Sequence, residues 1–263
     1  MARKRAFTLV ELLVVISIIS LLMSILLPSL NKAREQAKQV ACKSNLKQLG
    51  VVVMLYGDNN NGRFFAGWMG EQLTDANDQW PSALRRYYVN PKLRLCPNAM
   101  KPVSLKGKDG NIHPQSATEA WGIFPKDPGW AVEPGDYGSY GINAWICNPL
   151  PTTPIFANLR TAYWRGSEVK NAGNVPAFLD SYWMEIWPTI YEQPPPFPAA
   201  AFLNYPAGQG RSCILRHGNR GVNIVYLDGS VRDVRLRQLW DQKWHKQYTF
   251  DKIATIKWPD WLK

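Results

Sequence analysis

The sequence has few of the residues on which metal and nucleophile chemistry usually depends. It contains three histidines and four cysteines among 263 residues. The four cysteines are widely spaced: Cys42, Cys96, Cys147 and Cys213. No CxxC or Cys/His spacing indicates a zinc site. Asp58 and Asn60 alternate as in a calcium loop, but the distal glutamate of an EF-hand is absent. We therefore predict no metal and no cofactor.

The sequence also lacks a recognisable nucleic-acid-binding module, although its charge is strongly basic. It has 31 lysines and arginines against 20 acidic residues, a formal net charge of +11. Such a balance suits an acidic partner, for example nucleic acid, anionic lipid or a polyanionic glycan. Without a binding module, we interpret the excess as a basic solvated face and predict no nucleic-acid partner.

One long apolar segment dominates the N-terminal part of the chain. Phe7–Leu27 spans 21 residues with Glu11 as its single formal charge, and it follows a leader that contains Arg3, Lys4 and Arg5. As a helix it would extend about 31 Å, enough to cross a bilayer core of roughly 30 Å. The basic leader predicts a cytoplasmic N-terminus and an extracytoplasmic remainder. A carboxylate inside such a segment is costly, so it marks a functional site by default.

The segment Ala6-Phe7-Thr8-Leu9-Val10-Glu11 resembles the cleavage and methylation signal of type IV prepilins and type II secretion pseudopilins. Pro28 is the 22nd residue counted from Phe7, where that family usually carries a helix-kinking proline. The resemblance implies cleavage between Ala6 and Phe7 by prepilin peptidase and N-methylation of the new Phe7 amine. It also implies pairing of Glu11 with that amine on a neighbouring subunit. The family normally has glycine before the cut, so Ala6 predicts slower processing.

An ordinary signal anchor is the alternative interpretation, with Glu11 reaching back to the cytoplasmic interface. A cleaved secretory signal fits less well, because its apolar core would run only about 7–15 residues. Outside the cytoplasm, disulfides are permitted. The four cysteines allow three pairings, and free buried thiols are the alternative.

Apolar residues continue beyond Pro28 at helical spacing. They recur in steps of four and three: Cys42, Leu46, Leu49, Val53 and Tyr56. This stripe predicts an amphipathic helix that packs on a globular domain. The Gly- and Asn-rich run 57–62 predicts the end of that helix. We therefore predict a leader at 1–6, a helix at 7–56 with a transmembrane part 7–27 and a packed part 28–56, and a globular domain at 57–263.

Residues 63–212 alternate short apolar runs with proline and glycine, which is typical of loops and short strands. Pro176–Asp180 is predicted to be a buried strand of about five residues. Eight of the twelve tryptophans lie in this region, among them Trp121, Trp130, Trp145, Trp164, Trp183 and Trp187. Exposed, these rings could stack on sugars, whereas buried they would supply core area. We favour burial.

Asp228-Gly229 stands between two alternating apolar runs, a strong signal for a hairpin, which we place at 221–236. The segment from His217 to Gly229 resembles a prepilin-associated domain named for a histidine, nine intervening residues and Asp-Gly. Here ten residues separate His217 from Asp228. Cys96-Pro97 and Ser139–Asn143 resemble segments of a planctomycete-type pilin-like subgroup.

His217 and Asp228 are also the candidates for a general acid/base pair, which must converge near a reacting proton. The turn already accounts for Asp228, and no nucleophile motif stands nearby. We interpret His217 as a residue that hydrogen-bonds the hairpin, and we predict no catalytic residues and no enzymatic activity.

These features together predict an α+β protein. A long N-terminal transmembrane helix would continue into a pilin-like globular domain with a small antiparallel sheet and long loops. The predicted function is that of a structural subunit of a type IV pilus or type II secretion-like filament in the inner membrane. Its predicted partners are prepilin peptidase, other subunits and membrane lipid. The alternative is a membrane-tethered module that binds a glycan or another polymer without entering a filament.

Overall fold

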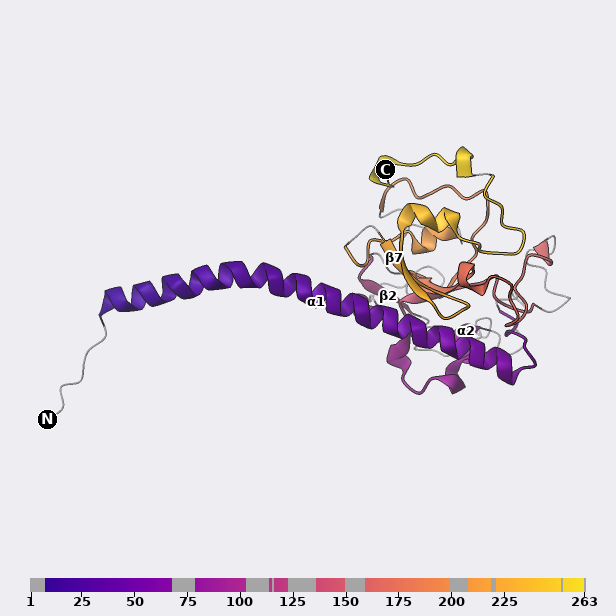
Figure 1. Cartoon of the computed structure of the whole chain (residues 1–263), viewed down its shortest axis with the longest axis horizontal. Helices are drawn as coiled ribbons and strands as arrows, with labels where there is room; N and C mark the ends of the chain where they lie inside the picture. Colours follow the sequence, from indigo (N-terminus) through magenta and orange to yellow (C-terminus); the bar gives the residue numbers. More distant parts are fainter. Residues whose placement is uncertain are drawn as a thin grey trace. The chain divides into compact units, whose positions relative to one another are not determined.

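The computed structural model describes residues 8–67, 79–102, 114, 116–122, 136–149, 159–198, 208–218, 221–251 and 253–262. The chain divides into two compact units, Met1–Val40 and Ala41–Lys263. The first helix, α1 (Leu9–Asn59), contributes residues to both units (Figure 1). The globular unit therefore includes the last part of this helix.

In the first unit, α1 exposes an uninterrupted apolar surface. All side chains from Thr8 to Ala37 are exposed, and leucine, isoleucine and valine dominate them as far as Leu30. Such a surface is far larger than soluble monomers usually present to water. By length and composition, the helix can cross a membrane. It therefore fits a single-pass membrane anchor, and Pro28 lies inside it.

In the globular unit, α1 buries the stripe that the sequence predicts. Cys42, Leu46, Leu49 and Val53 are buried. Tyr56 is partly buried, and its ring packs edge-on against Phe65 and Tyr87 with centroids 5.6 and 5.8 Å away. The helix ends at Asn59, three residues beyond the predicted end. Asn61 and Gly62 then adopt left-handed backbone angles, φ 55° and 73°, which stop the helix as the Gly/Asn run predicts.

Within the described residues, the main sheet of the globular unit has five strands in the order β6-β4-β5-β7-β8. Its strands are β4 (Tyr140–Asn143), β5 (Pro176–Asp180), β6 (Glu185–Ile186), β7 (Gly221–Tyr226) and β8 (Val231–Arg235). All neighbours are antiparallel except β6, which pairs with β4 in parallel. A smaller sheet joins β1 (Lys101–Pro102), β2 (Glu119–Gly122) and β3 (Tyr137–Gly138). The predicted α+β class, with a small and mainly antiparallel sheet, is confirmed.

The other helical segments within the described residues are short. They are α2 (Trp80–Ala83) and the 3₁₀ turns η1 (Arg85–Tyr87), η2 (Pro91–Arg94), η4 (Ala172–Asn174), η6 (Gln209–Ser212), η7 (Leu236–Asp241), η8 (Ile253–Thr255) and η9 (Asp260–Leu262). The basic segment after the hairpin has apolar residues at helical spacing, and it forms the short 3₁₀ turn η7. Its apolar residues Leu236, Leu239, Trp240 and Trp244 are nevertheless buried.

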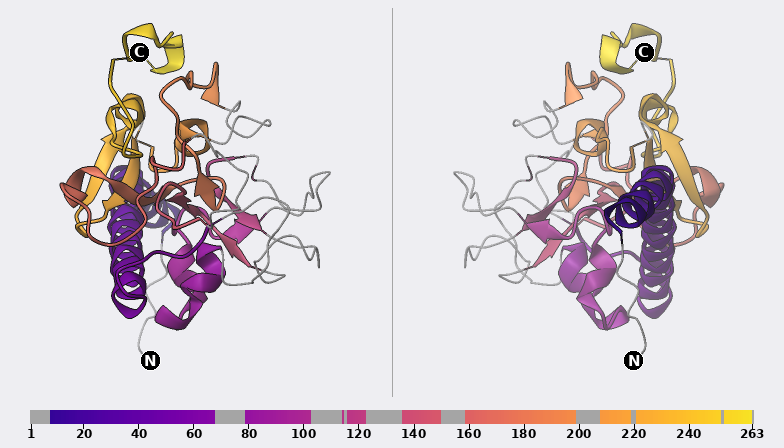
Figure 2. Two further views of the ribbon diagram at one scale, coloured as in Figure 1. Left: turned by 90° about the vertical axis from the view of Figure 1, so that its right-hand side faces the viewer. Right: turned by 90° about the vertical axis from the view of Figure 1, so that its left-hand side faces the viewer.

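The predicted strand Pro176–Asp180 is β5, and all five of its residues are buried. The predicted hairpin is formed by β7 and β8, with Gly229 at φ 79° in the turn. All six residues of β7 are buried, so this strand has no solvent-facing side. On one face of the sheet α1 approaches β7 closely (Figure 2), as the short distance between Gly50 and Val225 shows, and β5 and β8 pair with the two edges of the strand.

The described tryptophans of the loop-rich region form core, as predicted. The buried rings are Trp80, Trp121, Trp145, Trp164, Trp183 and Trp187, and Trp68 and Trp130 lie outside the described residues. Several indole N–H groups donate to backbone carbonyls: Trp121 to Tyr140 O (3.0 Å), Trp145 to Pro188 O (2.8 Å) and Trp164 to Trp244 O (3.0 Å). The rings thus supply apolar area while their polar edges satisfy irregular backbone.

The close approach of α1 to β7 generates a stability prediction. A Cβ at Gly50 would lie 2.7 Å from Val225 Cγ2. Alanine gains about 1 kcal/mol of helix propensity over glycine, but overpacking a core typically costs about 1–3 kcal/mol. We expect Gly50→Ala to lower the unfolding temperature of the full chain in detergent. In the Val225→Ala background the same substitution should be neutral or stabilising, and an equal loss in both backgrounds would contradict this account.

Candidate functional site

The N-terminal motif forms a capping box at the start of α1. The Thr8 amide and hydroxyl donate to Glu11 Oε2 at 2.8 and 2.7 Å, and the Glu11 amide donates to Thr8 Oγ1 at 3.3 Å. This reciprocal arrangement satisfies backbone donors that a helix start otherwise leaves unpaired. The pattern Thr-x-x-Glu in the sequence predicts a helix start. The interpretation of Glu11 as an assembly residue did not use this signal. Ala6 and Phe7, the predicted cleavage and methylation residues, lie outside the described residues.

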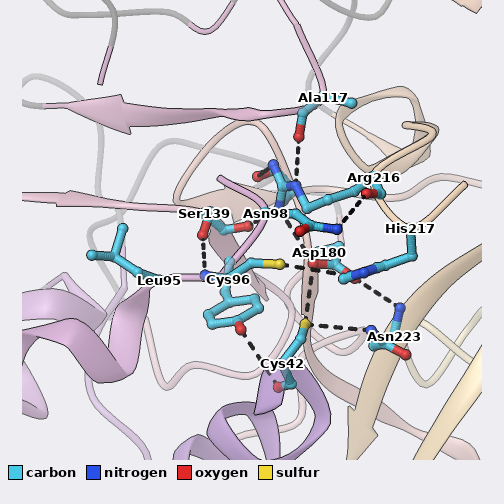
Figure 3. A network of polar contacts seen from close by, with 12 residues as sticks. Cys42, Leu95, Cys96, Asn98, Ala117, Ser139, Asp180, Arg216, His217 and Asn223 are labelled. Carbon is cyan, nitrogen blue, oxygen red and sulfur yellow. Dashed lines mark hydrogen bonds and ion pairs between the residues drawn. The ribbon is translucent and has the colours of Figure 1, made fainter. Parts of the chain in front are cut away.

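A second candidate site lies inside the globular unit, around the carboxylate of Asp180 (Figure 3). Asp180 is the last residue of β5 and is fully buried. Cys42 reaches it from α1, and Cys96 comes from the segment after η2. Arg216 and His217 come from the segment that precedes β7. Four separate parts of the chain therefore meet at one buried acid.

Each oxygen of Asp180 has two partners. Oδ1 lies 3.6 Å from Cys42 Sγ and 3.3 Å from Arg216 Nη1. Oδ2 lies 3.1 Å from His217 Nε2 and accepts the Asn223 amide at 2.9 Å. A carboxylate taken out of water is stable only with such pairing. The network thus uses one charge to hold α1, β7 and the His217 segment against β5.

The Arg216 guanidinium is itself fully enclosed. Its Nε donates to Ala117 O at 2.7 Å, Nη1 donates to Ser139 O, and Nη2 donates to Ser181 O at 3.1 Å. The side chain has no exposed area. Its donors therefore pair with backbone carbonyls as well as with Asp180, and this links the β3–β4 connection to the end of β5.

The two sulfur atoms of the cluster have polar neighbours as well. Asn223 Nδ2 donates to Cys42 Sγ at 3.3 Å, and Cys96 Sγ lies 3.7 Å from His217 Nε2. The ligand atoms of Cys42, Cys96, Asp180 and His217 all lie within 4.8 Å of one another. Thiolate, imidazole and carboxylate are the groups that bind zinc in proteins. These four residues are therefore able to hold a metal ion.

The electrostatic surroundings shift the pKa values of the two thiols in opposite directions. Burial raises the pKa of the Cys42 thiol far above its usual value. Burial opposes ionisation of Cys96 too, but the hydrogen bond from Cys42, together with His217 and Arg216, lowers the Cys96 pKa to about 6. Burial alone would lower the pKa of His217, but its contacts with Asp180 and Cys96 raise that pKa to about 10. The cluster thus favours one thiolate beside an imidazolium.

The structure does not bring together His217 and Asp228, the pair that the sequence analysis considered and set aside. His217 contacts Asp180 and Cys96, whereas Asp228 lies exposed in the hairpin turn and accepts the Ser230 amide at 2.9 Å. The expectation that His217 hydrogen-bonds the hairpin is therefore corrected. Its partner is the acid of β5, which in turn accepts the Asn223 amide of β7. Gly229 serves the turn through its left-handed backbone.

All four cysteines are buried free thiols in the structure. Cys42 and Cys96 share the Asp180 cluster. The other two lie elsewhere in the core, where burial raises the pKa of each thiol. The sequence left both disulfides and free buried thiols open, and the structure has free thiols.

Sequence reasoning missed Asp180, Arg216 and Asn223 as members of a site. A usable signal existed for Asp180 alone, because an aspartate at the end of a strand predicted to be buried requires a partner. Nothing in the spacing of the chain names Arg216 or Asn223 as that partner.

Comparison with known proteins bears on the N-terminal part of the chain. Residues 1–27 match the family model described as the prokaryotic N-terminal methylation motif. No curated protein and no solved structure shows significant similarity to the chain. The match supports a type IV pilin-like, processed protein whose apolar N-terminal helix fits a membrane anchor.

The buried network generates a second prediction. Asp180→Asn removes the charge but keeps the shape, and it leaves Arg216 and His217 without their counter-charge. Breaking a buried ion pair in this way typically costs about 3–5 kcal/mol. We expect a large fall in the unfolding free energy of the full chain in detergent, followed by tryptophan fluorescence. Asp228→Asn is the matched control, because that side chain is exposed in the turn. Equal effects of the two substitutions would contradict the role given to Asp180.

Proposed function

We propose that the chain is a pilin-like or pseudopilin subunit of a type IV pilus or type II secretion-like filament. In this proposal prepilin peptidase cuts between Ala6 and Phe7, the new amine is methylated, and α1 carries the subunit into a helical assembly. The supporting observation is the coincidence of two features in one segment. The methylation motif covers residues 1–27, and the helix that begins inside it exposes mostly apolar side chains from Leu9 to Leu30.

An exposed apolar helix needs lipid or other helices around it. In the membrane, lipid covers the surface from Leu9 to Leu30. In a filament, the helices of other subunits replace the lipid, and association then depends on close packing and on interhelical polar contacts. The basic leader supports a cytoplasmic N-terminus, with the globular unit on the opposite side of the inner membrane.

Glu11 would give the assembly its axial register. A carboxylate in a dry helix bundle requires a positive partner, and the methylated Phe7 amine of a neighbouring subunit is a chemically suitable one. The contact with Thr8 leaves this role possible, because a carboxylate offers about four acceptor positions. The capping box would hold Glu11 in place at the helix start before the neighbour arrives.

We propose no enzymatic activity. His217 and Asp228 have separate structural partners, and the Asp180 cluster is enclosed by packed side chains. The alternative of a polymer-binding module rested on exposed tryptophans. Six of the eight tryptophans in the loop-rich region are buried, so these six rings lend that alternative no support.

Processing is tested by intact mass and N-terminal analysis of protein from native membranes. We expect a chain that starts at N-methyl-Phe7, with uncleaved precursor present because alanine precedes the cut. Ala6→Gly should reduce the precursor fraction. A chain that keeps residues 1–6 in both proteins would contradict the processing step.

Assembly is tested at Glu11 with two substitutions that separate charge from capping. Glu11→Ala removes both, whereas Glu11→Gln keeps a side chain that can complete the capping box. We expect both variants to insert into the membrane and both to be depleted from sheared filaments at least about tenfold, which corresponds to about 1.4 kcal/mol. Glu35→Gln, at an exposed position paired with Lys38, is the control. Normal incorporation of Glu11→Gln would refute the role of the charge.

A further inference from the structure

Four potential metal ligands converge in the core of the globular unit, although they come from distant parts of the sequence. Cys42 and Asp180 are 138 residues apart, and Cys96 and His217 are 121 residues apart. The spacing of each cysteine and histidine in the chain gives no indication of this arrangement. Figure 3 shows the four side chains pointing toward a common centre from α1, the segment after η2, the end of β5 and the segment before β7.

The spacing of the ligand atoms fits a tetrahedral ion. Zinc bonds of about 2.3 Å to sulfur and about 2.0–2.2 Å to nitrogen and oxygen place the ligand atoms roughly 3.3–3.8 Å from one another. Cys42 Sγ lies 3.6 Å from Asp180 Oδ1, and Cys96 Sγ lies 3.7 Å from His217 Nε2. The other oxygen of Asp180, Oδ2, lies 3.1 Å from His217 Nε2. With one ligand atom taken from each of the four residues, all four atoms lie within 4.8 Å of one another.

The surroundings suit a closed, structural site. Cys42, Cys96 and Asp180 have no exposed area, and the His217 side chain is 2% exposed. Structural zinc sites use four protein ligands and have no open position. Around the ligands, Asn223 Nδ2 donates to Cys42 Sγ, and Arg216 and the Asn223 amide donate to the two oxygens of Asp180. Such outer contacts orient ligands in metal sites.

The charges also match. Two thiolates and one carboxylate carry three negative charges, which equal the two positive charges of zinc and the one of Arg216. Without Arg216 the loaded site would leave a buried net charge. Thiolate and imidazole ligands favour zinc, whereas calcium and magnesium take oxygen ligands.

We propose that Cys42, Cys96, Asp180 and His217 bind a structural zinc ion. On binding, the thiols and any imidazolium release their protons to solvent, so that S, N and O lone pairs reach the metal. The ion would fasten the globular part of α1 to three other segments of the core. This inference does not depend on the proposed filament function, because a membrane-tethered module would use the same clamp.

The test uses the full chain, purified in detergent under reducing conditions from zinc-supplemented cells. Zinc content is measured by elemental mass spectrometry. We expect about one zinc ion per chain in the natural protein, and a loss of at least about tenfold in Cys42→Ser, Cys96→Ser and His217→Gln. Cys147→Ser, Cys213→Ser and His245→Gln are matched controls, because they change buried residues of the same types outside the cluster. They should keep the metal.

A second measurement covers variants that fail to fold. The natural protein is stripped with a chelator, and zinc sulfate or cobalt chloride alone is added back. Zinc should raise the unfolding temperature, and cobalt should produce the visible absorption of a tetrahedral, thiolate-bound ion. A reduced natural protein that holds no zinc and takes up none would overturn the proposal. So would a Cys42–Cys96 disulfide in protein from native membranes, detected in a digest that was alkylated without reduction.

Discussion

The burial of one carboxylate organises the globular unit. Asp180 ends a strand that lies inside the sheet, so its charge has no access to water. Burying an unpaired charge would cost more than the whole net stability of a typical domain. The chain therefore has to bring compensating donors to it, and it does so from α1, from β7 and from the segment that carries Arg216 and His217. The arrangement of these segments around β5 follows from that requirement.

The helix α1 has two different environments along its length. Up to Ala37 its side chains are exposed and mostly apolar, which suits lipid or neighbouring helices. From Cys42 onward it buries one stripe against the globular core. The two ends of the helix are also capped in different ways. At its start the Glu11 carboxylate accepts hydrogen bonds from the Thr8 amide and hydroxyl, and at its end Asn61 and Gly62 adopt left-handed backbone angles.

His217 and Asp228 have separate roles in the structure. His217 pairs with the buried acid of β5, and Asp228 accepts a hydrogen bond in the hairpin turn. Because the two side chains have different partners, no contact between them fixes the number of residues that separates them. The same separation argues against a general acid/base pair. The likeness to known proteins covers residues 1–27, so the globular unit has to be understood from its own contacts.

Features that depend on neighbouring residues in the chain could be predicted from the sequence. The apolar run predicts the anchor helix, the stripe from Cys42 to Val53 predicts its buried face, and Asp228-Gly229 predicts the hairpin. The buried strand Pro176–Asp180 could be predicted for the same reason, because the local hydrophobic pattern and the turn residues determine these elements. The tertiary structure alone decided that Cys42, Cys96, Asp180 and His217 meet. Cys96 and His217 are 121 positions apart in the sequence, and Cys42 and Asp180 are 138 positions apart. Contacts over such separations depend on how the elements pack, and no local pattern encodes that packing.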